Sequence, residues 1–250
     1  MKLAVIMPAF NAELYVASAL DSLLRQRDAA ELDIIVVDDG STDGTGDIVR
    51  SIAREAPEVR LIEQPNRGIA RARNAGLDAL APETEVLTFL DADDLSPPGR
   101  FRRDLAHFGA EPALEFHYGF LSVFRSTTSP MEPAPLERPL ETRGIQLGAM
   151  LMRTALQKRI GYFDGDFEHG EDVDYIFRII ESQPRLMLVE DICVYYRRHP
   201  GNISRALDGT RTGTARAILK SHIRRKKTGA PSVPPGFFDG SRMGENPEWY

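Results

Sequence analysis

Short apolar runs alternate with segments of helical periodicity through the first 110 residues of the chain. Between these runs, apolar side chains recur at spacings of three and four residues, which predicts amphipathic helices. Continuous apolar strands that alternate with helices favour a parallel sheet covered on both faces. We therefore expect an α/β fold built on a mainly parallel sheet. The four predicted strands are Leu3–Met7, Ile34–Val37, Val59–Ile62 and Val86–Leu90.

The pattern is less regular after residue 110. Leu114–Phe124 alternates between apolar and polar residues, which predicts a half-exposed strand. The next segment, Ser126–Arg143, contains four prolines and is expected to be a loop or a mobile segment. Ile145–Arg153 has strand character again, and Val173–Ile180 has one apolar face at helical spacing. The stretch from Gly229 onward is rich in proline and glycine, so we expect a flexible tail there.

Composition excludes several classes of protein. The chain has 250 residues and a formal net charge of −6, which argues against nucleic-acid binding through a uniformly basic surface. Its single cysteine, Cys193, forbids an intrachain disulfide and fits a reducing compartment, or one indifferent to redox. No apolar run approaches the roughly 18 residues of a membrane span, and no signal peptide is evident. We therefore expect a cytoplasmic protein.

Common cofactor and nucleophile motifs are absent. The first predicted strand is followed by neither G-x-G-x-x-G nor G-x-x-x-x-G-K-[ST], which excludes dinucleotide and P-loop sites of those types. There is no G-x-S-x-G, and one cysteine with five histidines gives no zinc-ligand spacing. The remaining candidates are acidic clusters near predicted strand ends, where open α/β sheets bind their ligands.

Each acidic cluster has a functional and a structural interpretation. Asp91 and Asp93 follow an apolar strand and could converge on Mg²⁺ or Mn²⁺, or their loop could cap the next helix. Asp38 and Asp39 could accept hydrogen bonds from a nucleoside, or could serve a turn. Asp172, in the first turn of a predicted helix, could be a general base or only a favourable partner of the helix dipole.

Taken together, five segments resemble the family 2 glycosyltransferases, which have the GT-A fold. They occur in the family's order and at its usual separations, over about 170 residues. The resemblance implies a Rossmann-like, mainly parallel central sheet flanked by helices, then a mixed α/β acceptor half and a basic C-terminal helix and tail. The segments are Val5–Asn11 with Glu13, Ile35–Asp43, Asn66–Gly68 with Ala72–Gly76, Phe89–Asp94, and Gly170–Asp172.

The resemblance also implies how the chain is organised. Residues 1–110 would be the nucleotide-sugar-binding half of one domain, and residues 111–205 its acceptor-binding and catalytic-base half. Residues 206–250 would be a C-terminal helix and a flexible tail. The implied partners are a nucleotide-diphosphate sugar donor and a glycan or lipid-linked glycan acceptor, with no nucleic acid.

For the donor site, the resemblance implies contacts from four of the five matching segments. Phe10 would lie against the base and Glu13 near the ribose. Asp39 would read the edge of the base, which favours UDP, and Arg73 would reach the nucleotide or the sugar. The other implied donor contacts are Pro8, Ala9, Asn11, Asp91 and Ala92.

For the metal and the chemistry, the resemblance identifies a D-x-D motif that binds Mn²⁺ or Mg²⁺. Asp93 is the candidate for direct metal contact, with Asp91 beside it. His199 falls where some relatives place a residue near the diphosphate, and it is a further metal candidate. Asp172, preceded by Glu171, matches the catalytic base of the family. A direct displacement with one base inverts the configuration at the anomeric carbon, and we expect this outcome.

Two other functions remain open. A haloacid-dehalogenase-like phosphatase also carries a D-x-D at a strand end, and Gly165-Asp166 loosely resembles its late metal motif. The chain could also bind nucleotide sugars without catalysis, as a scaffold. Retention of Asp93, Glu171 and Asp172 argues against this second alternative, because like charges in one cleft repel one another.

Two surface features are unassigned by these motifs. Ten Arg or Lys and one acidic residue lie between Arg197 and Lys227. Such a stretch is usually a solvated helix face, but Arg211–Lys227 could also contact anionic lipid at the inner face of the cytoplasmic membrane. The proline-rich Ser126–Arg143 could close over bound substrate as a lid.

Overall fold

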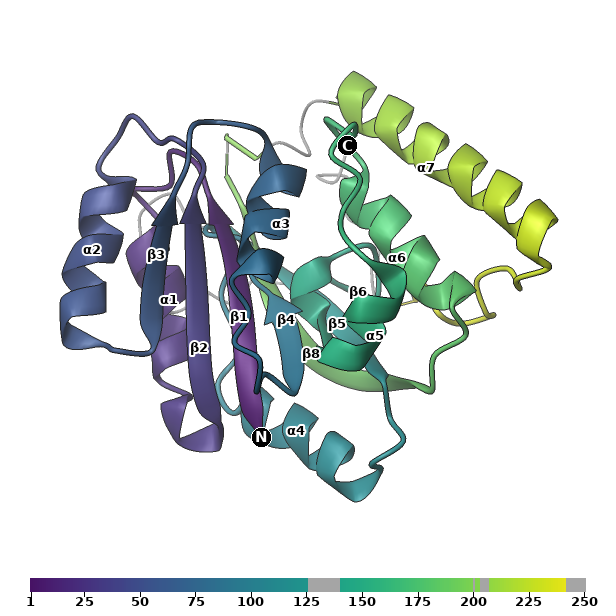
Figure 1. Cartoon of the computed structure of the whole chain (residues 1–250), viewed down its shortest axis with the longest axis horizontal. Coiled ribbons are helices and arrows are strands. Elements are labelled where there is room, and N and C mark those ends of the chain that lie inside the picture. Colours follow the sequence, from purple (N-terminus) through teal and green to yellow (C-terminus); the bar gives the residue numbers. More distant parts are fainter. Residues whose placement is uncertain (126–139, 200, 203–206, 242–250) are drawn as a thin grey trace.

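The computed structural model describes residues 1–125, 140–199, 201–202 and 207–241 (Figure 1). The strands are β1 (Lys2–Ala9), β2 (Glu31–Asp38), β3 (Val59–Glu63), β4 (Val86–Phe89), β5 (Phe116–Arg125), β6 (Leu140–Thr142), β7 (Met150–Arg153) and β8 (Leu186–Arg198). The helices are α1 (Val16–Leu24), α2 (Thr45–Glu55), α3 (Ile69–Asp78), α4 (Arg100–Ala110), α5 (Thr154–Ile160), α6 (Glu171–Glu181) and α7 (Leu207–Thr228).

All of these strands belong to one sheet. β3, β2, β1, β4, β7, β5 and β6 lie in that order, and β8 pairs with β5. The neighbours β3, β2, β1 and β4 are parallel to one another. β7 is antiparallel to both β4 and β5, β6 is antiparallel to β5, and β8 is parallel to β5. The expected mainly parallel sheet, flanked by helices and continued by a mixed half, is confirmed (Figure 1).

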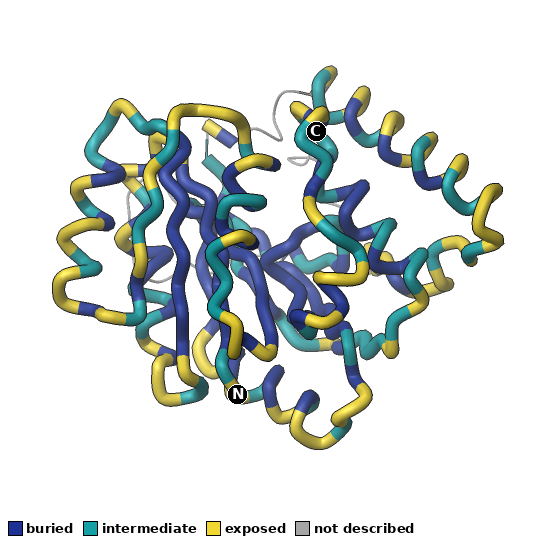
Figure 2. The backbone as a smooth tube through the Cα atoms, viewed as in Figure 1, coloured by how far each residue is buried: buried dark blue, intermediate teal, exposed yellow. Residues whose placement is uncertain are grey.

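The core lies along the central strands of the parallel half. Every residue of Leu3–Met7 and of Ile34–Val37 is fully buried, and Figure 2 shows these strands as an unbroken dark band. Helices and neighbouring elements cover both faces, so no position along these strands needs to be polar. This double burial is why the two strands are continuous apolar runs in the sequence.

Strand β5 is more deeply buried than its sequence predicts. Its alternating sequence predicts a half-exposed strand, but Phe116, His117 and Tyr118 are all fully buried. His117 is a buried polar residue, and Gly119 leaves room for β8, since a Cβ there would lie 2.4 Å from the sulfur of Cys193. His117 and Gly119 interrupt the apolar sequence of β5 but lie in its closely packed interior. The prediction of a half-exposed strand is therefore wrong.

Three further boundaries differ from the sequence pattern. Strand β7 begins only at Met150, because Leu147–Ala149 forms a 3₁₀ turn in which the Gln146 side chain accepts the Gly148 N–H at 3.1 Å. Part of the predicted 126–143 loop, Leu140–Thr142, is strand β6; residues 126–139, where the proposed lid falls, lie outside the described residues. β8 was not predicted, and its register shifts where Glu190 and Asp191 interrupt the apolar run.

The predicted flexible tail, residues 229–250, contacts the rest of the fold at Phe237 and Asp239. Phe237 is fully buried, and its ring stacks on Tyr118 with centroids 5.1 Å apart. Arg143 and Asp239 form an antiparallel bridge, with N–H to carbonyl distances of 2.8 and 3.0 Å. Phe237 and this bridge anchor the segment locally, while most side chains of residues 229–241 are exposed, and the expected flexibility of the tail stays a prediction. Residues 242–250 lie outside the described part.

Replacing this anchor should destabilise the fold. We expect Phe237→Ala to lower the free energy of unfolding by about 3 kcal/mol, because it removes a buried ring that stacks on β5. Urea denaturation followed by circular dichroism measures the change. The matched control is Phe238→Ala, since that neighbour is 39% exposed and should cost less than about 1 kcal/mol. Equal, small losses in both variants would mean that the tail does not contribute to the core.

Candidate active site

Three loops meet at the carboxyl edge of the parallel strands, where ligands of such sheets bind. They begin after Ala9 of β1, Asp38 of β2 and Phe89 of β4. The backbone N–H of Asp39 donates to the carbonyl of Ala9 at 2.8 Å, which holds the first two loops side by side. Three of the predicted donor contacts, Pro8, Ala9 and Ala92, are buried at this edge.

The first loop is fastened to the second by side chains predicted to hold the nucleotide. Asn11 adopts a left-handed φ of +49°, and its Oδ1 accepts the Thr42 N–H at 2.9 Å. Its own N–H donates to the Ser41 hydroxyl at 2.9 Å. The Oε2 of Glu13 accepts the Gly44 N–H at 2.8 Å. Asn11 and Glu13 therefore shape the edge on which a nucleoside would lie.

Phe10 and Asp39 differ sharply in exposure. Phe10 is 51% exposed, so its ring is accessible for stacking on a base. Asp39 is only 4% exposed, and its oxygens already accept Gln64 Nε2 at 2.7 Å and the N–H groups of Arg67 and Gly68 at 2.9 and 2.8 Å. Asp39 thus holds the loop that leads into α3, and its reading of a base edge stays a prediction.

The D-x-D loop (Asp91–Asp94) is anchored by its last carboxylate. Asp94 is fully buried and accepts the backbone N–H of Arg197 at 2.9 Å and Gln146 Nε2 at 3.0 Å. Burial, together with the charges of Asp93 and Asp91, raises the pKa of Asp94 well above its usual value. The side chains of Asp91 and Asp93 remain 26% and 27% exposed. Asp94 is therefore structural, and the other two carboxylates are accessible to a ligand.

Arg73 of α3 joins the D-x-D loop to α6. Its Nη2 donates to Asp91 at 2.9 Å and its Nη1 to Glu171 at 2.6 Å, while the side chain is only 3% exposed. Burial alone would lower the pKa of this guanidinium, but the charges of Asp91, Glu171 and Asp172 raise it above its usual value. Arg73 is thus a fixed cation between the two acidic motifs, and its contact with a donor stays a prediction.

Asp172 lies in the first turn of α6, directly after Gly170 and Glu171. Gly170 has a φ of +81°, a conformation that a side chain would strain, and α7 packs closely on it. Burial and the charge of Glu171 raise the pKa of Asp172 to about 7, although its Oδ1 accepts the Val173 N–H at 2.7 Å. A carboxyl group that titrates near neutral pH is suited to take and release a proton.

Asp93 contacts residues that directly follow β8. His199 Nε2 lies 2.8 Å from Asp93 Oδ2, and Asn202 Nδ2 donates to the same oxygen at 3.3 Å. The His199 ring packs on Tyr15 with centroids 4.4 Å apart. One carboxylate and one imidazole are suitable ligands for Mn²⁺, so the residues present fit the predicted metal. Two of the three predicted metal residues are thus together, while Asp91 is held by Arg73.

The sequence did not reveal every member of this site. Arg197 is fully buried, and its Nε donates to the Asp93 carbonyl at 2.7 Å. Asn202, on the loop after β8, is 7% exposed. Neither residue was identified, because β8 itself was not predicted. The available signal was the pair of apolar stretches on either side of Glu190-Asp191.

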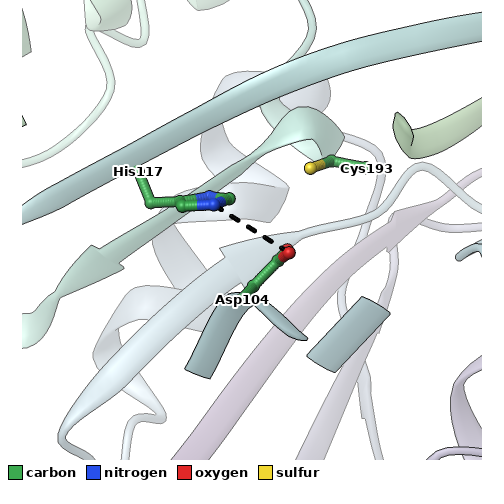
Figure 3. Close-up of side chains that lie close together, drawn as sticks. All are labelled: Asp104, His117 and Cys193. Carbon is green, nitrogen blue, oxygen red and sulfur yellow. Dashed lines mark ion pairs between the residues drawn. The ribbon is translucent and has the colours of Figure 1, made fainter. Parts of the chain in front are cut away.

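A second group of possible metal ligands lies between α4, β5 and β8 (Figure 3). Asp104, His117 and Cys193 are fully buried, with ligand atoms within 4.8 Å of one another, and no other such trio occurs within the described ranges. However, Arg100 and Arg103 already donate to Asp104 at 3.1 and 3.3 Å. Their two positive charges oppose a divalent cation at this position. We therefore interpret this group as a buried polar cluster, distinct from the predicted metal site.

Comparisons with known proteins agree with this architecture. Aligned over 218 residues, the chain is 28% identical to the uncharacterized glycosyltransferase EpsJ of Bacillus subtilis, which covers 80% of this chain and 62% of EpsJ. Staphylococcus aureus TarS (residues 1–349), in complex with UDP-GlcNAc, superimposes with a TM-score of 0.72 at 21% identity, covering 93% of this chain and 68% of that one. The mannosyltransferase PcManGT of Pyrobaculum calidifontis, in complex with GDP-Man and Mn²⁺, gives a TM-score of 0.67 at 21% identity, covering 93% and 66%.

These structures show that the fold is GT-A. The chain spans about three fifths of the length of EpsJ, and less of some other curated relatives. The sequence model of glycosyl transferase family 2 matches residues 4–170. That match includes the three loops at the sheet edge and the D-x-D, and it ends one residue before Glu171. Since the match covers more than half of the sequence, the chain belongs to glycosyl transferase family 2.

Proposed function

We propose that the protein transfers a sugar from a nucleotide-diphosphate donor, a UDP-sugar foremost, to an acceptor hydroxyl with inversion and with the help of a divalent cation. The observation that carries the proposal is the bridge made by Arg73. One buried guanidinium contacts Asp91 at 2.9 Å and Glu171 at 2.6 Å, so it fixes the D-x-D loop relative to the neighbouring Asp172. Donor phosphates and the proton acceptor would then lie on either side of one sugar.

The donor side of the proposal rests on the loops at the sheet edge. Phe10 is exposed for stacking on the base, and Asn11 and Glu13 shape the surface beside it. Asp93 and His199 would hold the metal, which when bound supplies positive charge against the diphosphate leaving group. PcManGT, which shares the fold, is in complex with Mn²⁺. TarS is in complex with UDP-GlcNAc and PcManGT with GDP-Man, so both nucleotides are candidates, and UDP comes first because the resemblance at Asp39 favours it.

The proposed chemistry assigns Asp172 the role of general base. Its carboxylate takes the proton of the acceptor hydroxyl as that oxygen attacks the anomeric carbon. Its pKa of about 7 lets it be ionised in the free enzyme near neutral pH and lets it hold the proton afterwards. Glu171, bonded to Arg73, carries the negative charge beside it that raises the pKa.

The ion pairs of the neighbouring carboxylates support the proposed inversion. A retaining double displacement needs a free carboxylate that attacks the sugar from its other face. Asp91 and Glu171, the nearest alternatives to Asp172, are both ion-paired with Arg73. A paired carboxylate is a weak nucleophile, so a single displacement with inversion is favoured.

The same geometry bears on the two alternatives. In a phosphatase the first aspartate of the D-x-D would be the nucleophile, but Asp91 is paired with Arg73. The family match over residues 4–170 includes that motif and gives the phosphatase no support. A non-catalytic nucleotide-sugar-binding protein would keep donor binding and lack transfer.

Donor hydrolysis and transfer assays test the proposal. The protein is incubated with UDP-, dTDP- and GDP-sugars, with Mn²⁺ or with chelator, and release of the nucleoside diphosphate is measured. Metal-dependent release from one donor class, with an inverted anomeric configuration in the product by NMR, is the expected result. Binding of a donor without release under any condition would favour the non-catalytic alternative, and a retained configuration would overturn the mechanism.

A further inference from the structure

The inner face of α7 packs against the rest of the protein. Gly213, Ala217 and Ser221, spaced four residues apart, are buried. A Cβ on Gly213 would lie 2.1 Å from the carbonyl oxygen of His169, so helix and loop touch through the glycine. His169 is three residues before Asp172. The N-terminal half of α7 therefore packs on the loop that carries the proposed base, and α7 forms one flank of the molecule outside α6 (Figure 1).

Only some cations of α7 are available to a partner. Lys220 pairs with Asp164, and Arg224 contacts Asp174 and Glu181 at 2.7 Å each. A further cation, Arg216, donates to a backbone carbonyl at 2.8 Å and lies over an aromatic ring. By contrast, no ion pair with the described residues holds the exposed side chains of Arg211, Lys226 and Lys227.

Large apolar side chains lie between these available cations. Leu219 and Ile223 are 59% and 44% exposed on two successive turns of α7, whereas Ile218 lines a hollow between α7, α6 and the segment after α7. Arg211 lies two turns before Leu219, and Lys226 and Lys227 lie one turn after Ile223. Figure 2 shows exposed residues recurring along this helix. We call the five residues Arg211, Leu219, Ile223, Lys226 and Lys227 the outer face of α7.

We propose that the outer face of α7 docks on the surface of an anionic lipid bilayer, so that a lipid-linked acceptor is presented beside Asp172. The acceptor part rests on the proposed function; the docking part does not. Apolar side chains flanked by Lys and Arg on an exposed helix match a bilayer interface, where the chains enter the headgroup boundary and the cations meet lipid phosphates. None of the helices in the described residues has the length and apolar character of a membrane span.

Charge and apolar surface together favour an anionic bilayer over a second copy of the chain or a nucleic acid as the partner of this face. The chain as a whole has a formal net charge of −6, while its unpaired cations on α7 surround an apolar centre. A second copy docked through the same face would bring like charges together. A nucleic acid would satisfy the cations but would leave Leu219 and Ile223 without an apolar partner. An anionic bilayer satisfies both kinds of residue.

Vesicle co-sedimentation tests the docking without donor or acceptor. The full chain is mixed with vesicles of phosphatidylcholine alone or with 30% phosphatidylglycerol, at low and high salt. We expect binding to the anionic vesicles only, weakened by salt, and at least tenfold weaker for Leu219→Gln/Ile223→Gln and for Lys226→Gln/Lys227→Gln. The matched control is Arg54→Gln/Lys158→Gln, which removes two exposed cations from other helices and should bind like the wild type.

Three results would overturn the docking. They are equal binding to neutral vesicles, unchanged binding by the Leu219→Gln/Ile223→Gln variant, and a vesicle-free dimer that this variant abolishes in sedimentation velocity. The last would assign the face to a second copy of the chain. Because these assays contain no sugar donor, they can fail while donor hydrolysis succeeds, and the reverse. Donor hydrolysis in solution should be unchanged in the double variants, whereas transfer to an acceptor carried in anionic vesicles should fall at least tenfold.

Discussion

Asp172→Asn should lower the rate of sugar transfer about 10³-fold while leaving donor affinity within about twofold of the wild type. The amide keeps the size of the side chain but cannot take the acceptor proton. Folding should be preserved, because burial already raises the pKa of Asp172 and an uncharged group is tolerated there. Steady-state transfer assays give kcat, and calorimetric titration of the nucleotide gives the donor affinity.

The matched control is Glu168→Gln, an exposed carboxylate on the same loop, which should retain full activity. The pH profile provides a second readout. Transfer by the wild type should fall as the pH drops below about 7, because protonated Asp172 cannot act as a base. Full activity of Asp172→Asn, or equal losses in both variants, would remove Asp172 from the role of base.

Arg73→Met should destabilise the protein by about 3 to 5 kcal/mol and abolish transfer. Methionine fills a similar volume but leaves the carboxylates of Asp91 and Glu171 without their counter-charge. Burial already raises the pKa of Asp91 and the charge of Arg73 opposes that rise, so the pKa of Asp91 would rise further in the folded variant and the folded state would bind a proton more readily than the unfolded chain. The deficit should therefore be largest near pH 8 and shrink as the pH falls through the raised pKa of Asp91. Urea denaturation at pH 8 and pH 5.5 measures this.

The control for Arg73→Met is Arg71→Met, on the exposed side of the same helix, which should change stability by less than about 1 kcal/mol at either pH. A loss in Arg73→Met that is independent of pH would indicate a packing defect. In that case the guanidinium would not be the link between the D-x-D loop and α6 that the proposed function needs.

The parallel half of the fold could be predicted because burial leaves a simple pattern there. Strands such as Leu3–Met7 are covered on both faces and so are uniformly apolar. Acidic residues follow these strands at the edge of the sheet. The core does not need carboxylates there, so they indicate a ligand site. The family resemblance indicates that these acidic segments belong to one site. The roles that it implies for Asp93, Asp172 and their neighbours stay predictions.

The second half depends on contacts between distant parts of the chain. His117 gives β5 a false alternation, since its polar ring is buried among residues of α4 and β8. Phe237 anchors a tail by stacking on a strand more than a hundred residues away. One partner of Asp94 is the backbone N–H of Arg197, and a backbone contact leaves no mark in the sequence. No local pattern predicts such pairings.

Calorimetric titration of UDP, with and without Mn²⁺, measures the proposed donor site most directly. The wild type should bind at least tenfold more tightly with Mn²⁺, a difference of about 1.4 kcal/mol. Asp93→Asn should lose that gain, while Cys193→Ser, in the other possible ligand group, should keep it. Titrations of dTDP and GDP reveal whether another base is preferred. No binding of any of the three nucleotides, or a metal effect that survives Asp93→Asn, would contradict the assignment of this sheet edge as a metal-dependent nucleotide-sugar site.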